Sequence, residues 1–282
     1  MSEVRACAVQ MVSTFDVDAN LRSAERLIGR AAEAGAKMVV LPENFAVLDS
    51  DNLFKWGEAE KTQGIFSGFL SQQSAHHGVW IVGGTIPCRT RPDGSLVSDK
   101  RVNATSLVFN AAGEQVGRYD KIHLFDVSVQ DNQGEYKESR VIEPGNALSV
   151  VDSPLGKLGL TVCYDLRFAG LYSALSEKGC DAFTIPSAFT ARTGSAHWEM
   201  LVRARAIENQ AFVIAPNQGG QHTLKRETWG QSMIVDPWGA VLSQLESGPG
   251  IVVADLDFEW QREVRAAMPV QQHQCFRAIV KK

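Results

Sequence analysis

One cysteine stands where a nucleophile would be presented to a substrate. Cys163 ends an apolar, β-branched run in the segment GLTVCYDLRF, and Asp165 and Arg167 follow it. A side chain at a strand-to-helix turn is exposed at the carboxyl edge of a sheet, and the positive end of the following helix favours a thiolate. A cysteine in such a run is, however, most often a small apolar core residue. Both interpretations of Cys163 stay open on this segment alone.

A cysteine nucleophile needs a base to take its proton and a donor to meet the developing oxyanion. Histidine is the familiar base, but His123 and His197 both have the context of hydrogen-bonded structural histidines. Glu43, in MVVLPEN, leaves a buried apolar strand, where partial removal from water would make a carboxylate a stronger base. Lys121, in GRYDKIHLFD, would place fixed positive charge beside an acyl oxygen. The alternatives are a solvated strand-end acid and a surface lysine.

These residues are spaced along a chain in which short apolar runs alternate with amphipathic helical stretches. The pattern predicts strands at 4–11, 38–44, 79–87, 181–189 and 211–216, and helices at 20–37, 64–78, 169–178 and 195–210. Two hairpin-like units, 105–121 and 230–245, are candidates for equivalent parts of two similar halves. Mixed strands with helices outside them imply an α/β layered fold.

No Pro-, Gly- or Ser-rich linker divides the chain, and its longest irregular piece is 125–147. We therefore expect one domain over residues 1–282, with a core at about 4–257 and a C-terminal tail at about 258–282. A chain of 282 residues is near the upper limit for one domain and is long enough to bury a sizeable core.

Composition narrows the function classes. The chain is 44% hydrophobic and 21% charged, which is typical of a soluble globular protein. A net charge of −4 and the lack of a basic face argue against nucleic acid and membrane surfaces as partners. The segment MSEVRACAVQM does not have the pattern of a signal peptide, and no apolar run approaches the roughly 20 residues of a spanning helix. We expect a soluble cytoplasmic protein.

The cysteines are odd in number and widely scattered, at positions 7, 88, 163, 180 and 275. The sequence has no CxxC pair and no HExxH motif, which argues against a zinc site. We expect neither a metal nor another cofactor.

Three segments taken together resemble one family. LPEN with Glu43, YDKIHLF with Lys121 and VCYDLRF with Cys163 resemble, in order and approximate separation, the Glu-Lys-Cys triad motifs of the nitrilase (carbon–nitrogen hydrolase) superfamily. The similarity continues through PSAFTARTGSAHWEM and MIVDPWG and covers about residues 4–275. It implies a four-layer α-β-β-α sandwich, usually paired across a dimer interface, so we expect a homodimer or a higher homo-oligomer. It also implies hydrolysis of non-peptide or modified C–N bonds through a thioester.

The resemblance assigns a role to each motif residue. Glu43 would take the thiol proton and later activate water, and Cys163 would carry the acyl group. Lys121 and the backbone N–H of Tyr164 would hold the oxyanion.

The family also has a second glutamate after the lysine. Glu138 in GEYKESRVIEPG stands in the matching position, where it would orient the substrate or the lysine. Glu135 and Glu143 are close enough in the sequence to remain alternatives.

The residues after the cysteine indicate the type of substrate. Members called true nitrilases tend to have Trp-Glu there, whereas this chain has Tyr164 and Asp165, as the amidase branches do. We therefore expect an amide substrate. Arg167 would grip a substrate carboxylate through two parallel hydrogen bonds, and a salt bridge to Asp165 or Glu138 is the structural alternative.

Two amidase branches fit. Omega-amidases hydrolyse α-ketoglutaramate, and deaminated glutathione amidases cleave a larger relative into α-ketoglutarate and cysteinylglycine. The chain is more similar to the second branch in FDVSVQDNQGEYKESR, GGQHTLKRETWGQSMIVDPWG and REVRAAMPVQQHQ. His222, Lys225 and Arg226 would meet the far carboxylate of the longer substrate, unless they belong to an ordinary solvated loop.

Two further classes stay open. A superfamily member that binds partners and has lost catalysis would be indicated by a missing triad residue, and none is missing. A papain-like Cys-His hydrolase would have its nucleophile near a mature N-terminus and a downstream histidine on a strand, and the sequence has neither.

Overall fold

The first of two large β-sheets is built mainly from the N-terminal half of the chain in the computed structural model, which describes residues 3–276. Its strands are β1 (Glu3–Gln10), β2 (Met38–Val40), β3 (Trp80–Val82), β4 (Ile86–Cys88), β5 (Asn103–Phe109), β6 (Gln115–Asp120) and β17 (Gly250–Asp257). β1, β2 and β3 are parallel, while β17 lies antiparallel to β1 and β5 antiparallel to β3. A parallel centre with antiparallel edges therefore forms this sheet.

The second sheet repeats this arrangement. It contains β9 (Val150–Ser153), β10 (Gly156–Leu160), β11 (Ala182–Thr184), β12 (Phe212–Ala215), β15 (Ser232–Val235) and β16 (Val241–Leu245). β10, β11 and β12 are parallel, β9 flanks β10 in the antiparallel sense, and the hairpin β15–β16 follows β12. The two predicted hairpin units are thus β5–β6 and β15–β16, which occupy equivalent places in the two sheets.

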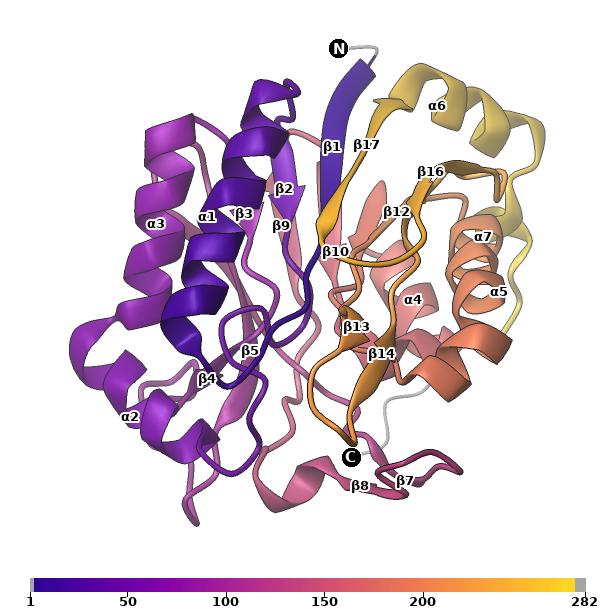
Figure 1. Cartoon of the computed structure of the whole chain (residues 1–282). Coiled ribbons are helices and arrows are strands. Elements are labelled where there is room, and N and C mark those ends of the chain that lie inside the picture. The colour runs from indigo at the N-terminus through magenta and orange to yellow at the C-terminus, as the bar shows by residue number, and fades with distance from the viewer. Residues whose placement is uncertain (1–2, 277–282) are drawn as a thin grey trace.

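Helices cover the outer faces of both sheets, as Figure 1 shows. α1 (Val17–Glu33), α2 (Leu53–Gln63) and α3 (Ile65–His77) lie on the side of the first sheet, and α4 (Ala169–Ser176) and α5 (Ala191–Asn209) on the side of the second. α6 (Phe258–Ala267) and α7 (Val270–His273) follow the last strand. The expected four-layer α-β-β-α sandwich is confirmed.

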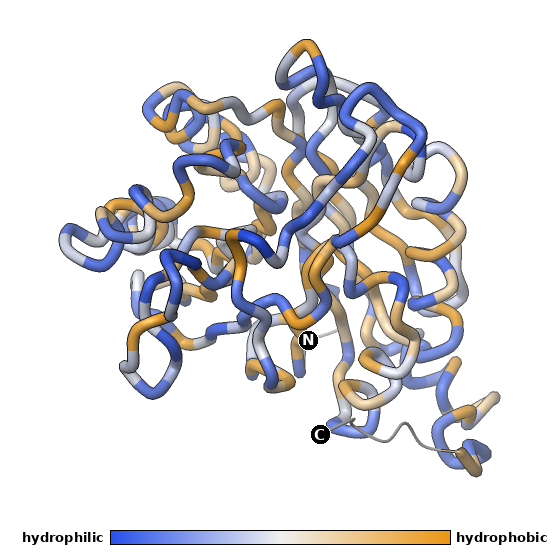
Figure 2. Tube along the Cα trace, turned by 90° about the horizontal axis from the view of Figure 1, so that it is seen from below, coloured by the Kyte–Doolittle hydropathy of each residue, from blue (hydrophilic) through white to orange (hydrophobic). Residues whose placement is uncertain are grey.

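Side chains alternate along each strand between two apolar layers. On β1, Ala6 and Ala8 belong to the core shared with the second sheet, whereas Cys7 and Val9 pack with Leu27 and other apolar residues of the helices. Figure 2 shows the apolar strands running through the interior, with polar segments toward the periphery. The apolar core therefore holds the two large sheets against each other, and the loops at their edges are available for catalytic residues.

The predicted strand at 79–87 is two strands. β3 and β4 both pair with β5, but the chain is interrupted between them at Gly83–Thr85. Gly84 has φ +53°, and a Cβ there would lie 2.1 Å from the carbonyl oxygen of Pro42. Only glycine allows this close approach, which presses the chain against the loop that carries Glu43.

Other segments are more regular than expected. The piece 125–147, predicted to be irregular, contains β7 (Asp126–Ser128), β8 (Glu135–Lys137) and a 3-10 turn, η1 (Glu138–Arg140). The predicted loop after β12 contains the hairpin β13 (Gly219–Gln221) and β14 (Glu227–Trp229). Such short pairs lack the periodicity from which strands are predicted.

The tail predicted at 258–282 begins with α6, which is tied to the second sheet: Arg265 Nη1 donates to Asp181 Oδ1 at 2.8 Å.

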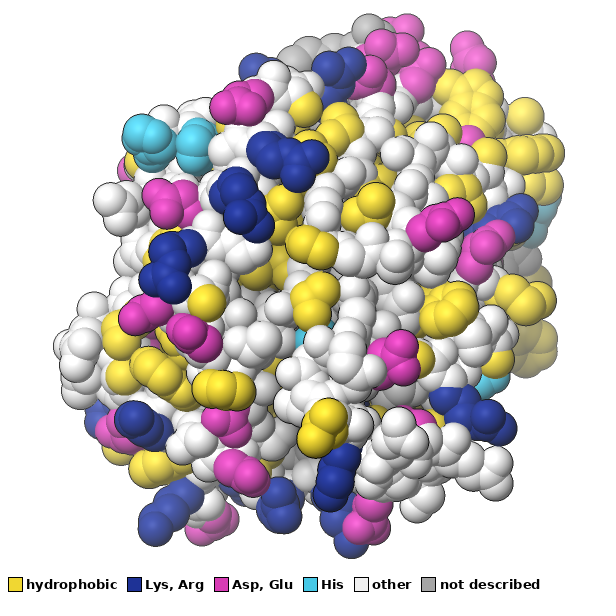
Figure 3. Space-filling model, viewed as in Figure 1, with side chains coloured by type: hydrophobic (Ala, Val, Ile, Leu, Met, Phe, Trp, Pro, Cys, Tyr) yellow, Lys and Arg dark blue, Asp and Glu magenta, His cyan; other side chains and the backbone are white. Residues whose placement is uncertain are grey.

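Residues 1–2 and 277–282 of the predicted domain lie outside the described residues. Within 3–276, every helix is too short or too polar to span a bilayer. Figure 3 shows basic and acidic side chains interspersed on one face of the molecule.

Candidate active site

Glu43, Lys121 and Cys163 lie in three loops that leave the sheets at one edge. Glu43 follows β2, Lys121 directly follows β6, and Cys163 follows β10 and opens a second 3-10 turn, η2 (Cys163–Arg167). The carboxyl ends of parallel strands in packed sheets form this kind of shared edge. The fold therefore brings together residues that are up to 120 positions apart in the sequence.

Cys163 is held in a backbone conformation that a side chain seldom adopts. Its φ is +47°, in the left-handed region that costs an L-residue about 1–2 kcal/mol. The fully buried Asp165 stabilises the turn: its Oδ2 accepts from Val162 N at 2.8 Å and Tyr119 Oη at 2.7 Å. Its Oδ1 lies 2.7 Å from His123 Nδ1 and accepts from His123 N at 3.1 Å. This network positions the thiol.

Lys121 lies between two carboxylates. Its Nζ donates to Glu43 Oε1 at 2.8 Å and to both Glu138 oxygens, each at 2.8 Å. The Lys121 side chain is 2% exposed and that of Glu43 is 5% exposed. The two oxygens of one carboxylate subtend too small an angle at Nζ for two tetrahedrally arranged N–H bonds, so Glu138 shares one N–H and Glu43 accepts another. The third N–H of the ammonium group has no acceptor among residues 3–276.

The charges of this cluster determine the protonation of its members. Burial by itself would lower the pKa of Lys121, but the charges of Glu138 and Glu43 outweigh it and raise that pKa well above its ordinary value. Burial, opposed by Lys121, raises the pKa of Glu138. Burial, followed by the charge of Glu43, raises the pKa of the Cys163 thiol well above its ordinary value. The resting cysteine is therefore a thiol that must give its proton to a base.

Two backbone amides belong to residues that line the cavity. The N–H of Tyr164 has no acceptor among residues 3–276, so it is available to an oxyanion. The backbone of Ala188, in the loop after β11, lies close enough to Cys163 to act against the rise in the pKa of its thiol. Ala188 was not among the predicted site residues, although its place after a parallel strand of the same sheet was a usable signal.

Gln218, after β12, was also missed. Its Nε2 donates to the backbone carbonyl of Glu43 at 3.0 Å and to Ser13 Oγ at 2.8 Å. The loop that carries the carboxylate is thus fastened to the second sheet, which holds Glu43 over the cysteine of the other half.

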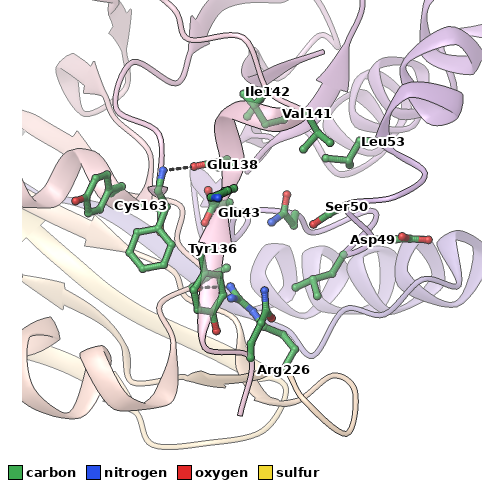
Figure 4. Close-up of a pocket in the computed structure, with 18 of the residues that line it drawn as sticks. Glu43, Asp49, Ser50, Leu53, Tyr136, Glu138, Val141, Ile142, Cys163 and Arg226 are labelled. Carbon is green, nitrogen blue, oxygen red and sulfur yellow. Dashed lines mark hydrogen bonds between the residues drawn. The ribbon is translucent and has the colours of Figure 1, made fainter. Parts of the chain in front are cut away.

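A cavity of about 520 Å³ opens over these groups. Figure 4 shows Cys163, Glu43 and Glu138 between two walls. Arg226 and Tyr136 form one wall, and Leu53, Val141 and Ile142 lie on the opposite side. This volume is within the range of cavities that bind small molecules.

The neighbouring glutamates predicted as alternatives to Glu138 have other partners. Glu135 pairs with Lys137 at 3.0 Å and is exposed. Glu143 pairs with Arg91 at 2.5 Å. Of the three, Glu138 is the one bonded to the lysine.

Neither candidate histidine lines the cavity. His123 Nδ1 is engaged with Asp165, and its ring stacks on Phe168 with centroids 3.7 Å apart. His197 Nδ1 lies 3.2 Å from Arg167 Nη1. The geometry therefore brings Glu43, and not a histidine, to the thiol.

Arg167 also lies outside the cavity lining. Its guanidinium lies over the rings of Tyr164, at 5.9 Å, and Phe189, at 5.3 Å, and it pairs with neither Asp165 nor Glu138. Its predicted role in holding a substrate carboxylate has no support from its position.

The predicted substrate loop is divided. His222 is buried, with Nδ1 2.7 Å from Ser13 O and Nε2 2.6 Å from Thr228 Oγ1. Burial lowers the pKa of His222 to about 4, so it is a neutral anchor for the hairpin β13–β14. Lys225 and Arg226 do line the cavity.

Comparison with known proteins gives one family. The carbon-nitrogen hydrolase family model matches residues 5–266. A deaminated glutathione amidase of Yersinia enterocolitica is 37% identical over 276 residues, covering 98% of this chain and 94% of that protein. The omega-amidase NIT2 of Danio rerio is 38% identical over 271 residues, covering 96% and 94%. The crystal structure of Saccharomyces cerevisiae Nit3, a member of branch 10 of the nitrilase superfamily, superposes with a TM-score of 0.84 at 31% identity, covering 98% and 97%.

Proposed function

The chain belongs to the carbon–nitrogen hydrolase family, and from that premise we propose that it is a cysteine-dependent amidase that hydrolyses deaminated glutathione. One observation carries the chemistry: a buried thiol, a carboxylate and an ammonium group from three separate loops converge at the base of one cavity. Each of the groups that a covalent acyl transfer requires is present within this cluster.

The first half of the reaction forms a thioester. Glu43 takes the thiol proton of Cys163 as the sulfur attacks the amide carbon. The carbonyl electron pair moves to oxygen, where Lys121 Nζ and the N–H of Tyr164 stabilise the negative charge. The tetrahedral intermediate collapses, the C–N bond breaks, and the proton on Glu43 passes to the departing nitrogen.

The second half releases the acid. Glu43 takes a proton from water, and the resulting hydroxide attacks the thioester carbon through the same oxyanion site. The C–S bond breaks, the electron pair returns to sulfur, and Glu43 returns its proton so that the thiol is restored. The backbone of Ala188, which lies close to Cys163, would stabilise the departing thiolate.

The relatives named for the two candidate substrates are almost equally similar to this chain, so overall identity does not choose between the substrates. The Yersinia enterocolitica relative is named for deaminated glutathione and the Danio rerio relative for omega-amidase activity. We place the chain with the first because its segments 125–140, 219–239 and 262–274 are more similar to that branch. The omega-amidase relative makes hydrolysis of α-ketoglutaramate the second candidate.

One side-by-side assay separates these candidates. Purified protein is given deaminated glutathione, α-ketoglutaramate and pentanamide, and kcat/KM is measured for each. The proposal predicts the highest value for deaminated glutathione. A preference for α-ketoglutaramate would make the protein an omega-amidase, and no turnover of any amide, with Cys163 intact, would contradict an enzymatic role.

The proposal also includes assembly and location. We propose a homodimer or higher homo-oligomer that acts in the cytoplasm. Analytical ultracentrifugation and fractionation of the source cells test these two statements, and a monomer or a membrane-bound fraction would contradict them.

A further inference from the structure

We infer that Arg226 holds the carboxylate at the end of the substrate's acyl half, and that the leaving half lies on the opposite side of the cavity. This inference rests on the proposed function and deepens it, because it selects amides whose acyl chain itself ends in a carboxylate. It also differs from the sequence-based expectation, which gave Arg226 to the leaving half.

The position of Glu43 sets the orientation. The departing nitrogen must accept a proton from Glu43, so the leaving half must lie beside this carboxylate. The segment that continues from Glu43 lines the cavity with Val47, Asp49, Ser50 and Leu53. Figure 4 shows Asp49, Ser50 and Leu53 on one side of Glu43, together with Val141 and Ile142.

Arg226 reaches the cavity from the turn of the hairpin β13–β14. Its Nη2 donates to the carbonyl oxygen of Ala188 at 3.0 Å, and the backbone of the same residue lies close to Cys163. One residue therefore separates the guanidinium from the nucleophile, and a residue spans at most about 3.6 Å of chain. The acyl half, bonded to the sulfur, can extend only to this side because Glu43 and the leaving half occupy the other.

The length of the acyl chain fits this separation. In a five-carbon diacid, four C–C bonds of about 1.5 Å each join the reacting carbon to the far carboxylate. An extended chain of this length, starting at the sulfur, is long enough to reach a guanidinium that is bonded to Ala188.

Arg226 is prepared for an anion. Its guanidinium lies 4.8 Å from the ring centroid of Tyr136, a contact that restricts its movement. None of the salt bridges found among residues 3–276 includes Arg226. Asp131, whose charge is near Arg226, already accepts from Tyr136 Oη at 2.8 Å and from Gly134 N at 2.8 Å. A planar cation without an ion-pair partner suits bidentate binding of a carboxylate.

The other side of the cavity has a different character. Leu53, Val141 and Ile142 present apolar surface there. These apolar side chains, beside the polar Asp49 and Ser50, form no fixed ion pair with the amine and so accept a leaving group of variable size, from ammonia to a dipeptide. The Arg226 side of the cavity therefore binds the carboxylate of the acyl half, and the opposite side contacts the leaving amine.

The test compares three amides in variants of the two walls. α-Ketoglutaramate and deaminated glutathione share the acid end, and pentanamide has the same chain length without the carboxylate. Arg226→Gln should raise KM about 10- to 100-fold for both acids relative to pentanamide, as the loss of a charge-assisted hydrogen bond implies. Arg226→Lys, which keeps the charge but loses the planar fork, should restore part of this loss.

Two controls accompany these variants. Arg192→Gln removes an exposed arginine that does not line the cavity and should leave all three KM values within about 3-fold, since surface changes have small effects. Leu53→Phe narrows the opposite wall and should raise KM for deaminated glutathione alone.

An effect of Arg226→Gln on deaminated glutathione alone would overturn the inference, because it would place Arg226 on the leaving half. Equal loss on pentanamide would overturn it in favour of a structural role. A binding measurement separates this failure from that of the proposed function. The inactive Cys163→Ala protein should bind α-ketoglutarate at least about 10-fold more weakly when Arg226→Gln is added, whichever amide proves to be the substrate.

Discussion

Replacing Glu138 by Gln tests the role of the second carboxylate in the cluster, which is bonded to the proposed oxyanion donor. The change preserves the shape of the side chain and removes its charge. Lys121 then keeps one carboxylate partner, Glu43, while it remains as buried as before. The new amide group must also turn either its NH₂ or its oxygen toward Phe125 N, which now donates to Glu138 Oε2 at 2.6 Å.

The distances set the expected magnitude. Two unit charges 2.8 Å apart interact by about 6 kcal/mol at an effective dielectric constant of about 20, and the glutamine carbonyl recovers part of this. The measured worth of a hydrogen bond to a charged group, about 1.5–3 kcal/mol, is the better guide. It corresponds to a fall in kcat of about 10- to 150-fold.

The pH profile gives the more specific result. In the wild type, the charges of Glu138 and Glu43 overcome burial and keep the pKa of Lys121 well above its ordinary value. Without the charge of Glu138, only Glu43 opposes the lowering effect of burial, so the pKa of Lys121 falls. The protonated lysine is the active form, so activity is lost as the pH rises through its pKa, and the alkaline limb of kcat should move to lower pH in Glu138→Gln.

The neighbouring glutamates are matched controls. Glu135→Gln alters an exposed pair with Lys137 and should change kcat by less than about 3-fold. Glu143→Gln weakens the pair with Arg91 and should affect stability more than the shape of the pH profile. Wild-type kcat and an unmoved alkaline limb in Glu138→Gln, with a large loss at either control, would refute the assignment.

Three further predictions concern the nucleophile, the base and the metal. Cys163→Ala should abolish turnover and keep Tm within about 4 °C; residual amidase activity, or a trapped acyl adduct that mass spectrometry locates on Cys7, Cys88 or Cys180, would identify another nucleophile. Glu43→Gln should lower kcat by about 10²- to 10⁴-fold, whereas His197→Ala should be nearly silent; the reverse result would favour a Cys-His mechanism. Exhaustive treatment with a chelator should leave kcat/KM unchanged, and a loss that zinc restores would contradict a metal-free reaction.

The fold could be predicted largely because its strands and helices have strong periodicity. The parallel strands lie in apolar runs, and helices such as α1 (Val17–Glu33) have one buried stripe, with Leu27 and Ile28 at its centre. The break at Gly84 escaped prediction because it depends on contact with Pro42, which is distant in the sequence. The hairpins β7–β8 and β13–β14 escaped because three-residue strands have no measurable alternation.

The same difference applies to the site. Residues at the ends of regular elements could be predicted, whereas side-chain directions that depend on tertiary contacts could not. The sequence could predict that four of the site residues lie together, because each follows an element whose end could be located or matches a motif. These residues are Glu43, Lys121, Glu138 and Cys163. Arg167 was placed by its distance in sequence from the cysteine, and no such count shows that the turn η2 directs its side chain onto aromatic rings. The catalytic roles of Glu43, Lys121, Glu138 and Cys163 remain predictions.

The hydrogen bonding of Lys121 has a consequence for the proposed mechanism. Both oxygens of Glu138 lie 2.8 Å from Nζ, but the two oxygens of one carboxylate subtend too small an angle there for two tetrahedrally arranged N–H bonds. They therefore share one N–H, and Glu43 Oε1 accepts another at 2.8 Å. The third N–H has no acceptor among residues 3–276, so it is the donor that can meet an oxyanion. The two carboxylates thus orient the ammonium group, and an oxyanion can bind without breaking either hydrogen bond. Glu138 then acts by holding Nζ in place, and substrate does not have to displace it.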